Sequence, residues 1–224
     1  MDDPLRMYLV LQRGAVTALA RAGELAGAAA VACVRAFDGD PALAAWRPHP
    51  GKVCLRARTA SQWRQVLEEP HALAGDPDGE SAVALPPRRR SERGPLLERL
   101  QAMSSELEPP PASAPPGGGV TYLINPALAM SSGKTIAQVA HAAVMAADTG
   151  RLEDWVAAGC PAQVLAPPPA AFAAACRRDD LAARVVDAGL TEVAPGTITV
   201  LALTLPTPRR PEAEDSASTT PMAG

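Results

Sequence analysis

The sequence SSGKTIAQVAHAAV, residues 131 to 144, decides how the rest of this chain is interpreted. No proline interrupts it, and a serine at its start can cap the free N–H groups of a helix. Apolar residues recur within it at helical spacing and predict one packed face. Lys134, Gln138 and His141 fall at positions i, i+4 and i+7 and share another face. The stretch therefore predicts an amphipathic helix with a polar face.

Lys134 lies in the first turn of this helix, where it adds a full positive charge to the partial charge of the helix N-terminus. Such a place attracts an anion or a developing oxyanion. Of the 21 basic residues, only Lys52 and Lys134 are lysines. A lysine kept against that bias suggests a need for its compact, rotatable ammonium group. The alternative is a solvated polar face on an ordinary amphipathic helix.

The composition is that of a chain that can build cores from small side chains. Hydrophobic residues make up 47% of the 224 residues, but aromatic residues only 3%, so we expect tight packing of alanine. The formal net charge of −3 argues against a general basic surface for nucleic acid. One basic cluster, Arg88-Arg89-Arg90 with Arg93, can meet phosphate, and a solvated run of charge is the alternative.

The sequence gives no sign of a membrane segment, a metal site or a cofactor. No apolar run is long enough to span a bilayer, and the start Met-Asp-Asp-Pro lacks the order of a signal peptide, so we expect a cytoplasmic protein. The four cysteines are scattered without a CxxC pair. We therefore expect buried free thiols, with neither zinc nor disulfides.

Two segments of low complexity divide the chain. Residues 104–119 are rich in proline and glycine and predict a flexible or semi-extended linker, and residues 206–224 predict a disordered tail. They delimit a first half, residues 1–103, and a second half, residues 120–205. Strand and helix patterns alternate in both halves, which indicates α/β layers.

The predicted elements follow the same order in the two halves. In the first half they are strands at 7–11, 52–56 and 81–85, the last ended by Pro86-Pro87, and helices at 16–36 and 60–68. In the second half they are strands at 121–124, 163–166, 181–187 and 197–205, and helices from 131 and over 169–177.

The halves also align residue by residue. An offset of 110 places Gly133 and Lys134 over Gly23 and Glu24, and an offset of 109 places Trp155 over Trp46. We interpret this as an internal duplication. Its polar face is not duplicated, because Glu24, Ala28 and Val31 stand where Lys134, Gln138 and His141 would be repeated. The sequence thus predicts two copies of one fold, of which the first has lost its site.

A second informative stretch, DAGLTEVAPGTITVL, runs from Asp187 to Leu201. It places one carboxylate at a strand end, a glycine turn after it, and threonines at 191, 197 and 199. Thr197 and Thr199 are two residues apart on a strand and share a face. By itself the pattern is also that of an ordinary polar hairpin.

Together the two stretches resemble the type 2 peptidyl-tRNA hydrolase family. The shared features are Gly133-Lys134, Gln138, His141-Ala142-Ala143-Val144, Asp187-Ala188-Gly189, Thr191, Ala194-Pro195-Gly196 and Thr199. The resemblance covers about Val120 to Leu205 and implies a small three-layer fold, a four-stranded mixed β-sheet covered by helices. It also implies hydrolysis of the ester that joins a peptide to tRNA, by a homodimer.

Two departures concern basic residues. Asn125-Pro126 stands where the family usually has an arginine and an acidic residue, and Leu190 replaces a basic residue after Asp-Ala-Gly. The second half carries five basic and seven acidic residues, whereas the first hundred residues carry 14 and 12. We therefore expect the first half to supply phosphate contacts that the second half lacks.

On this resemblance, ester hydrolysis needs a positioned water and donors at the developing oxyanion. We expect Asp187 to orient and polarise the water and Lys134 to stabilise the oxyanion or hold the 3′-terminal ribose and phosphate. Thr191 and Thr199 would fix the water and the ester. The expected substrate-binding residues are Gly133, Gln138, His141 and Thr197.

A chain with one intact copy and one copy that has lost its site suggests a monomer that acts as an intramolecular pseudo-dimer. Two other interpretations stay open. The first is a non-catalytic relative that binds tRNA or protein. The second is a P-loop nucleotide binder, because Gly133-Lys134-Thr135 is similar to the end of that motif; however, Leu128 stands where the motif requires glycine.

Overall fold

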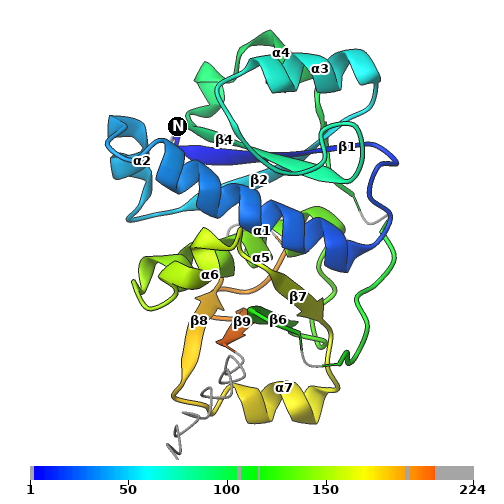
Figure 1. Ribbon diagram of the computed structural model, residues 1–224, viewed down its shortest axis with the longest axis vertical. Helices are drawn as coiled ribbons and strands as arrows, with labels where there is room; N and C mark the ends of the chain where they lie inside the picture. The colour runs from blue at the N-terminus through cyan, green and yellow to red at the C-terminus, as the bar shows by residue number, and fades with distance from the viewer. Residues whose placement is uncertain (1–2, 105–106, 116, 190–191, 205–224) are drawn as a thin grey trace, which may run out of the picture.

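The computed structural model describes residues 3–104, 107–115, 117–189 and 192–204. They form a mixed α/β structure with two mixed sheets, as the alternating patterns predicted (Figure 1). The elements of the first half are β1 (Arg6–Gln12), α1 (Leu19–Ala36), α2 (Pro41–Trp46), β2 (Gly51–Ala57), α3 (Ala60–Glu68), β3 (Ala72–Gly75), β4 (Ser81–Arg88), the 3₁₀ turn η1 (Arg90–Glu92), α4 (Gly94–Arg99) and β5 (Gln101–Ala102). Those of the second half are β6 (Val120–Ile124), α5 (Ser132–Asp148), α6 (Glu153–Ala157), β7 (Ala162–Leu165), α7 (Pro169–Ala175), β8 (Leu181–Val186) and β9 (Ile198–Thr204).

The two sheets share one strand topology. The first has the order β3-β4-β1-β2-β5 and the second the order β7-β6-β9-β8. In each, the first strand of the half pairs in parallel with the next strand (β1 with β2, β6 with β7) and antiparallel with the last long strand (β4, β9). The remaining strand, β3 or β8, completes the edge in antiparallel pairing. Apart from β5, the strand order and directions are therefore the same in both halves.

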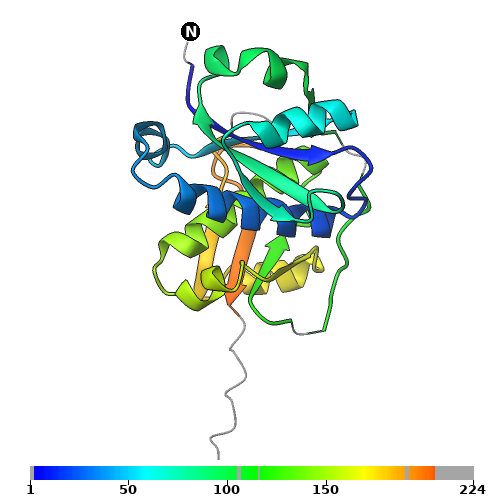
Figure 2. The ribbon, with the colours of Figure 1, turned by 45° about the horizontal axis from the view of Figure 1, so that its top comes forward.

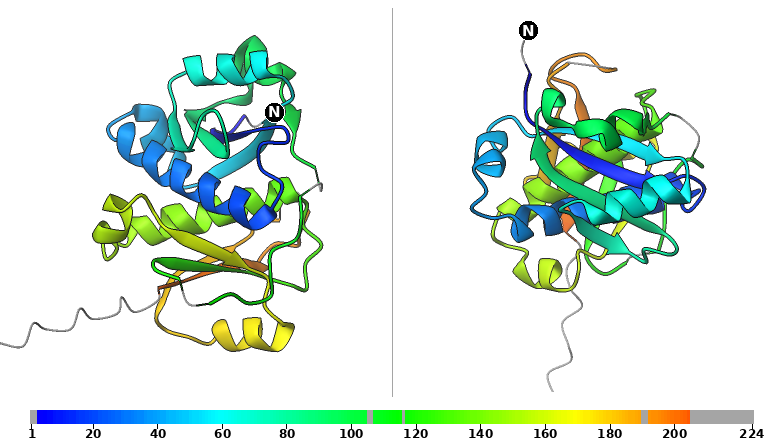
Figure 3. Two further views of the ribbon diagram at one scale, coloured as in Figure 1. Left: turned by 45° about the vertical axis from the view of Figure 1, so that its right-hand side comes forward. Right: turned by 90° about the horizontal axis from the view of Figure 1, so that it is seen from above.

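The elements stack in five layers. Helices α1 and α5 lie side by side between the two sheets, α3 and α4 cover the outer face of the first sheet, and α7 covers the outer face of the second (Figures 1, 2 and 3). One buried cluster combines the inner faces of both sheets with α1 and α5. Since this core is shared, the two halves are not independent packing units.

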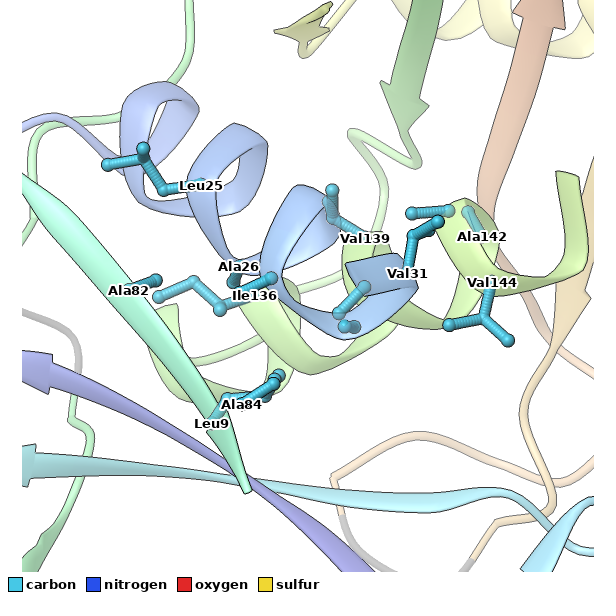
Figure 4. Packing of buried hydrophobic residues seen from close by; sticks show 14 of the residues in the cluster. Leu9, Leu25, Ala26, Val31, Ala82, Ala84, Ile136, Val139, Ala142 and Val144 are labelled. Atoms are coloured by element: carbon cyan, nitrogen blue, oxygen red, sulfur yellow. The ribbon is translucent and has the colours of Figure 1, made fainter. Parts of the chain in front are cut away.

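Small residues bring α1 and α5 close together, as the alanine-rich composition predicted. A Cβ added at Gly27 of α1 would lie 3.2 Å from the Cβ of Ala143 of α5. Figure 4 shows the flanking side chains of both helices, among them Val31 and Val139, packed between the sheets. Close helix packing of this kind leaves little room for larger side chains at the contact.

The two tryptophans that the sequence aligned occupy matching positions. The indole N–H of Trp46 donates to the carbonyl of Gly51 at 2.7 Å, and that of Trp155 donates to the carbonyl of Pro161 at 2.9 Å. Each acceptor lies where the second parallel strand of its half begins. Both rings are buried, and each indole thereby fixes the entry to β2 or β7.

Several predicted boundaries are corrected. Strand β4 continues through Pro86 and Pro87. The pairing of β4 with β3 does not extend beyond Ala84, and on the other side the prolines lie at a shift in the register with β1. Neither proline is therefore at a position where the ladder needs an N–H donor. The first sheet has five strands instead of four, since Gln101–Ala102 pairs with the edge of β2. The short helix α2 was not predicted, although Asp40 caps it and its Asp-Pro start is a signal for a helix N-terminus.

The predicted linker is held to the surface over part of its length. The Glu108 N–H donates to the Thr17 carbonyl at 2.8 Å, and the Leu19 N–H donates to the Glu108 carbonyl at 2.9 Å. Leu107 packs against the shared core. This segment therefore caps the start of α1 instead of only spanning the gap between the halves. The predicted tail, residues 206–224, lies outside the described residues.

Within the described ranges, no helix is both long and apolar enough to cross a membrane. Of the four cysteines, Cys33, Cys54 and Cys160 are buried and Cys176 is partly exposed, all as free thiols. Burial raises the pKa of Cys160 to about 11. A buried thiol with a raised pKa is less reactive, because less of it is thiolate. The partial exposure of Cys176 departs from the expectation that all four thiols are buried.

Candidate functional site

Lys134 and Gln138 of helix α5 lie beside the end of the second sheet at which β8 ends. Its N-terminus forms as predicted, because the Ser131 hydroxyl accepts a hydrogen bond from the Lys134 N–H at 3.1 Å. The helical spacing of four residues then places both side chains toward the end of β8, where Asp187 follows Val186. Thr199, the second residue of β9, is fully buried beside them.

Asp187 is the centre of this arrangement. Its Oδ2 forms an ion pair with the Lys134 ammonium and accepts a second hydrogen bond from Gln138 Nε2 at 2.9 Å. Its Oδ1 accepts from the Gly189 N–H at 2.8 Å. The Asp187 side chain is only 5% exposed and that of Lys134 13%. Three donors at this depth hold the carboxylate in one orientation.

Gln138 connects Asp187 to Thr199. While its Nε2 donates to Asp187, its Oε1 accepts from the Thr199 hydroxyl at 2.7 Å. All four side chains, Lys134, Asp187, Gln138 and Thr199, are thus joined in one continuous network. The direct bridge through Gln138 was not foreseen, since the sequence indicated this residue only as a substrate contact.

The hairpin after β8 is closed by backbone hydrogen bonds. The Asp187 N–H donates to the Thr197 carbonyl and the Gly196 N–H donates to the Asp187 carbonyl, both at 2.9 Å. Gly189 has a φ of 76°, and a Cβ there would collide with the ring of Pro195. Glycine is therefore required at this turn, and the turn aims its N–H at the carboxylate of Asp187.

Glu192 secures the other side of the site. Its carboxylate accepts from the N–H and from the hydroxyl of Ser131, each at 2.7 Å. This ties the hairpin to the N-terminus of α5. Asn125, one of the departures from the family pattern, donates from Nδ2 to the Ile198 carbonyl at 2.8 Å and so holds β9. Neither contact was predicted from the sequence, since neither residue lies at a motif spacing.

The first half of the chain contacts the start of α5. A Cβ added at Gly133 would lie 2.6 Å from the Met103 carbonyl oxygen, so the two segments touch only because residue 133 is glycine. Met103 in turn donates its N–H to the Cys54 carbonyl of β2 at 3.1 Å. Gly133, predicted as a substrate contact, therefore meets the first half of the same chain.

His141 lies one turn beyond Gln138 but outside the network, and among the described residues it makes no hydrogen bond. Burial, together with the positive charges of Lys52 and Lys134, lowers the pKa of its imidazole to about 3, and the charge of Asp187 opposes this shift. His141 is thus neutral at pH 7. Burial also lowers the pKa of Lys52 to about 7, although its ammonium lies 4.6 Å from the centre of the Trp46 ring.

The corresponding place in the first half holds different chemistry. Glu24, at the position aligned with Lys134, pairs with Arg21 at 3.4 Å, and Arg21 also pairs with Glu80 at 3.1 Å. Burial raises the pKa of Glu24, which Arg21 opposes. No network like that of Asp187 is made by the described residues here, since Ala28 and Val31 replace Gln138 and His141.

The structure therefore brings together Lys134, Gln138, Asp187 and Thr199, with the Thr197 backbone beside them, and leaves His141 apart. Thr191, predicted to fix the water or the ester, lies outside the described residues. Among the residues that are described, no group of three or more histidine, cysteine or acidic side chains is placed to hold a metal ion. A fixed carboxylate, an ammonium group and a hydroxyl at a helix N-terminus suit the orientation of a polar substrate and the stabilisation of a developing negative charge.

Comparison with known proteins gives a match in the second half of the chain. Residues 120–211 match the family model of the peptidyl-tRNA hydrolase PTH2, which covers less than half of the chain. All four network residues lie in the matched segment. No solved structure matches the chain.

Proposed function

We propose that this protein hydrolyses the ester bond between a peptide, or another N-substituted aminoacyl group, and tRNA. The observation that carries the proposal is the network of Lys134, Gln138, Asp187 and Thr199 within the segment that is similar to peptidyl-tRNA hydrolases. These are the residue types that ester hydrolysis requires: a carboxylate to align water and a cation for the oxyanion.

Asp187 orients the attacking water. A carboxylate has about four lone-pair sites, and Lys134, Gln138 and Gly189 use three of them. The remaining site accepts one proton of a water molecule and aligns its lone pair with the ester carbonyl. Because a carboxylate is a weak base, most of the acceleration comes from positioning, which suffices for a labile ester.

Lys134 supplies positive charge where the carbonyl oxygen becomes an oxyanion, or at the terminal ribose and phosphate. The N-terminal dipole of α5 adds to this charge. Thr199 holds Gln138, and Gln138 holds Asp187, so these two act as positioning residues. For Thr191, Thr197, His141 and Gly133 we keep the roles that the resemblance implies: Thr191 fixes the water or the ester, and the other three contact the substrate.

We also propose that the chain is an internal duplication and works as a monomeric pseudo-dimer in the cytoplasm. The matching sheet topologies and the matching tryptophan hydrogen bonds support the duplication. The contact of Met103 with Gly133 and the shared core support a first half that takes the place of a second subunit. Sedimentation should find a monomer; a stable dimer that pairs two second halves would contradict this.

One observation favours the non-catalytic alternative. Lys134 covers the carboxylate of Asp187, which leaves little of it open to solvent. A protein that only binds tRNA keeps this ion pair closed, whereas a hydrolase must open it when substrate enters.

Release of labelled peptide from N-acetyl-aminoacyl-tRNA tests the proposal. The wild type should hydrolyse the ester, and Lys134→Met should reduce kcat/KM by about 100-fold or more. Arg151→Met, which removes an exposed cation of the second half outside the network, is the control and should retain the wild-type rate. A wild type that binds tRNA without hydrolysing the ester would support the binding protein instead.

A further inference from the structure

A cavity of about 340 Å³ lies on the outer side of the first half, away from the α1 and α5 layer. Its lining includes Arg6, Arg90 and Arg93, together with Tyr8, Val53 and Asp3. The volume falls at the lower end of the range of about 300 to 1,000 Å³ that ligand pockets occupy. Part of the basic cluster seen in the sequence is therefore gathered around a concave site.

The three arginines differ from others in the molecule. Arg21, Arg35, Arg47, Arg88 and Arg178 each form an ion pair with a carboxylate. In the part of the chain that the structure describes, the guanidinium groups of Arg6, Arg90 and Arg93 form none, and they make no hydrogen bond. The cavity thus concentrates guanidinium groups that form no ion pair with the described residues.

Two of these side chains are held in place by their surroundings. The Arg6 guanidinium lies against Gly51, where a Cβ would collide with it. The Nε of Arg93 is buried without a hydrogen-bond partner. A buried donor of this kind costs free energy unless a ligand supplies an acceptor.

Asp3 is the one acidic residue among the described residues of the lining, and its carboxylate already accepts hydrogen bonds. It accepts from the N–H groups of Arg90 and Ser91 at 2.9 and 3.2 Å and from the Ser91 hydroxyl at 2.6 Å. These hydrogen bonds hold η1 to the N-terminal segment and so fix the backbone that carries Arg90. With three arginines against one aspartate, the described lining carries a net positive charge.

We propose that this cavity binds a phosphate group through Arg6, Arg90 and Arg93. Arginine is suited to phosphate because its planar, permanently charged fork matches two phosphate oxygens at once. The phosphate belongs to the tRNA backbone; this assignment of the phosphate to tRNA rests on the proposed function. The first half then grips the tRNA whose ester the second half cleaves, and offsets the net negative charge of the second half.

The test compares the full-length wild type with the double variant Arg90→Gln/Arg93→Gln. The first arm measures the Kd for deacylated tRNA by fluorescence anisotropy at several KCl concentrations. The double variant should bind about tenfold more weakly at low salt. Its slope of log Kd against log salt should be shallower by about one to two, since fewer counterions are released.

Two further variants keep the test sharp. Arg64→Gln removes an exposed arginine of α3 that does not line the cavity, and its Kd and slope should equal those of the wild type. Arg90→Glu reverses the charge of an exposed side chain without removing core packing, and should weaken tRNA binding even if the double variant folds poorly.

The second arm measures the melting temperature in inorganic phosphate, which a bound ligand raises. The rise should occur in the wild type and Arg64→Gln and be lost in the double variant. This pattern can also occur in a wild type that neither binds nor hydrolyses charged tRNA. In that case the phosphate site is supported, its ligand is a small phosphate compound, and the proposed function is contradicted. Equal tRNA binding and equal phosphate response in wild type and double variant would overturn the site.

Discussion

Asp76 and Asp187 make the same set of hydrogen bonds at the ends of two different sheets. Each donates its N–H across the hairpin, to Glu80 or Thr197, and accepts at its own carbonyl from a glycine, Gly79 or Gly196. Each carboxylate also accepts from the N–H two residues on, at 3.0 Å for Asp76 and 2.8 Å for Asp187. The hairpins differ in length and in what meets the carboxylate.

Comparison of these two aspartates shows which contacts the second half has that the first half lacks. Asp187 is 6% exposed because Lys134 and Gln138 reach it, whereas Asp76 is exposed and the chain offers Glu24 and Ala28 at the aligned positions. The local hairpin therefore places an aspartate in both halves, and only the helix beside it turns that aspartate into part of a network. Asp76 is a natural control for experiments on Asp187.

Replacing Gln138 with leucine should separate positioning from folding. The change keeps the side-chain volume but removes one donor from Asp187 and the acceptor of the Thr199 hydroxyl. We expect kcat for peptidyl-tRNA to fall about tenfold, with a loss of about 1–3 kcal/mol in the free energy of unfolding. Gln65→Leu, the same substitution on α3 outside the network, is the control. Wild-type activity in Gln138→Leu would show that the network does not position Asp187.

Gly133→Ala should destabilise the contact between the halves. The new Cβ would meet the Met103 carbonyl oxygen and Cβ, at 2.6 and 2.9 Å, and the backbone of Met103 cannot move without disturbing β2. We expect a loss of about 1–3 kcal/mol, despite the better helix propensity of alanine. Urea unfolding measures it. Gly118→Ala, where a Cβ meets open space, should leave the midpoint unchanged, and equal midpoints for both variants would contradict the contact.

His141 should make stability depend on pH. Its pKa is about 3 in the folded protein, against 6.5 for the free group. Between these values the unfolded chain binds a proton that the folded protein does not, so stability falls as the pH drops from 6.5 toward 3. One such group contributes at most about 1.4 kcal/mol per pH unit. In urea unfolding between pH 7 and 5, His141→Gln should lose less stability than the wild type; parallel curves would contradict the burial of a neutral imidazole.

Local patterns were enough to predict most long elements. The helix capped by Ser131 formed where its capping residue and periodicity placed it. The strand predicted at residues 121–124 also formed, and it begins one residue earlier, at Val120. Lys134 and Asp187, predicted as parts of one site, meet in the structure. Strand β3 was missed because Ala72–Gly75 is short and lacks β-branched residues, and β4 was cut short because its prolines lie where the ladder needs no N–H.

The contacts that sequence could not predict are those between distant segments. The contact of Met103 with Gly133 depends on how α5 packs on the first sheet, and no spacing in the chain encodes it. The match of Asp76 with Asp187 does not appear in the alignment of the two halves, because the unequal hairpin lengths break the constant offset. The cavity of Arg6, Arg90 and Arg93 joins β1 to η1, so the sequence showed only the arginines that are adjacent in the chain.

The most direct measurement is the rate of peptide release from N-acetyl-aminoacyl-tRNA by the wild type, Asp187→Asn and Asp76→Asn. Both substitutions remove one negative charge at the same place in a hairpin, but only Asp187 contacts Lys134 and Gln138. The account predicts that Asp187→Asn loses about 100-fold or more of kcat/KM, while Asp76→Asn keeps the wild-type rate. Equal rates in the two variants, or activity that depends on Asp76 instead, would contradict a hydrolytic site in the second half.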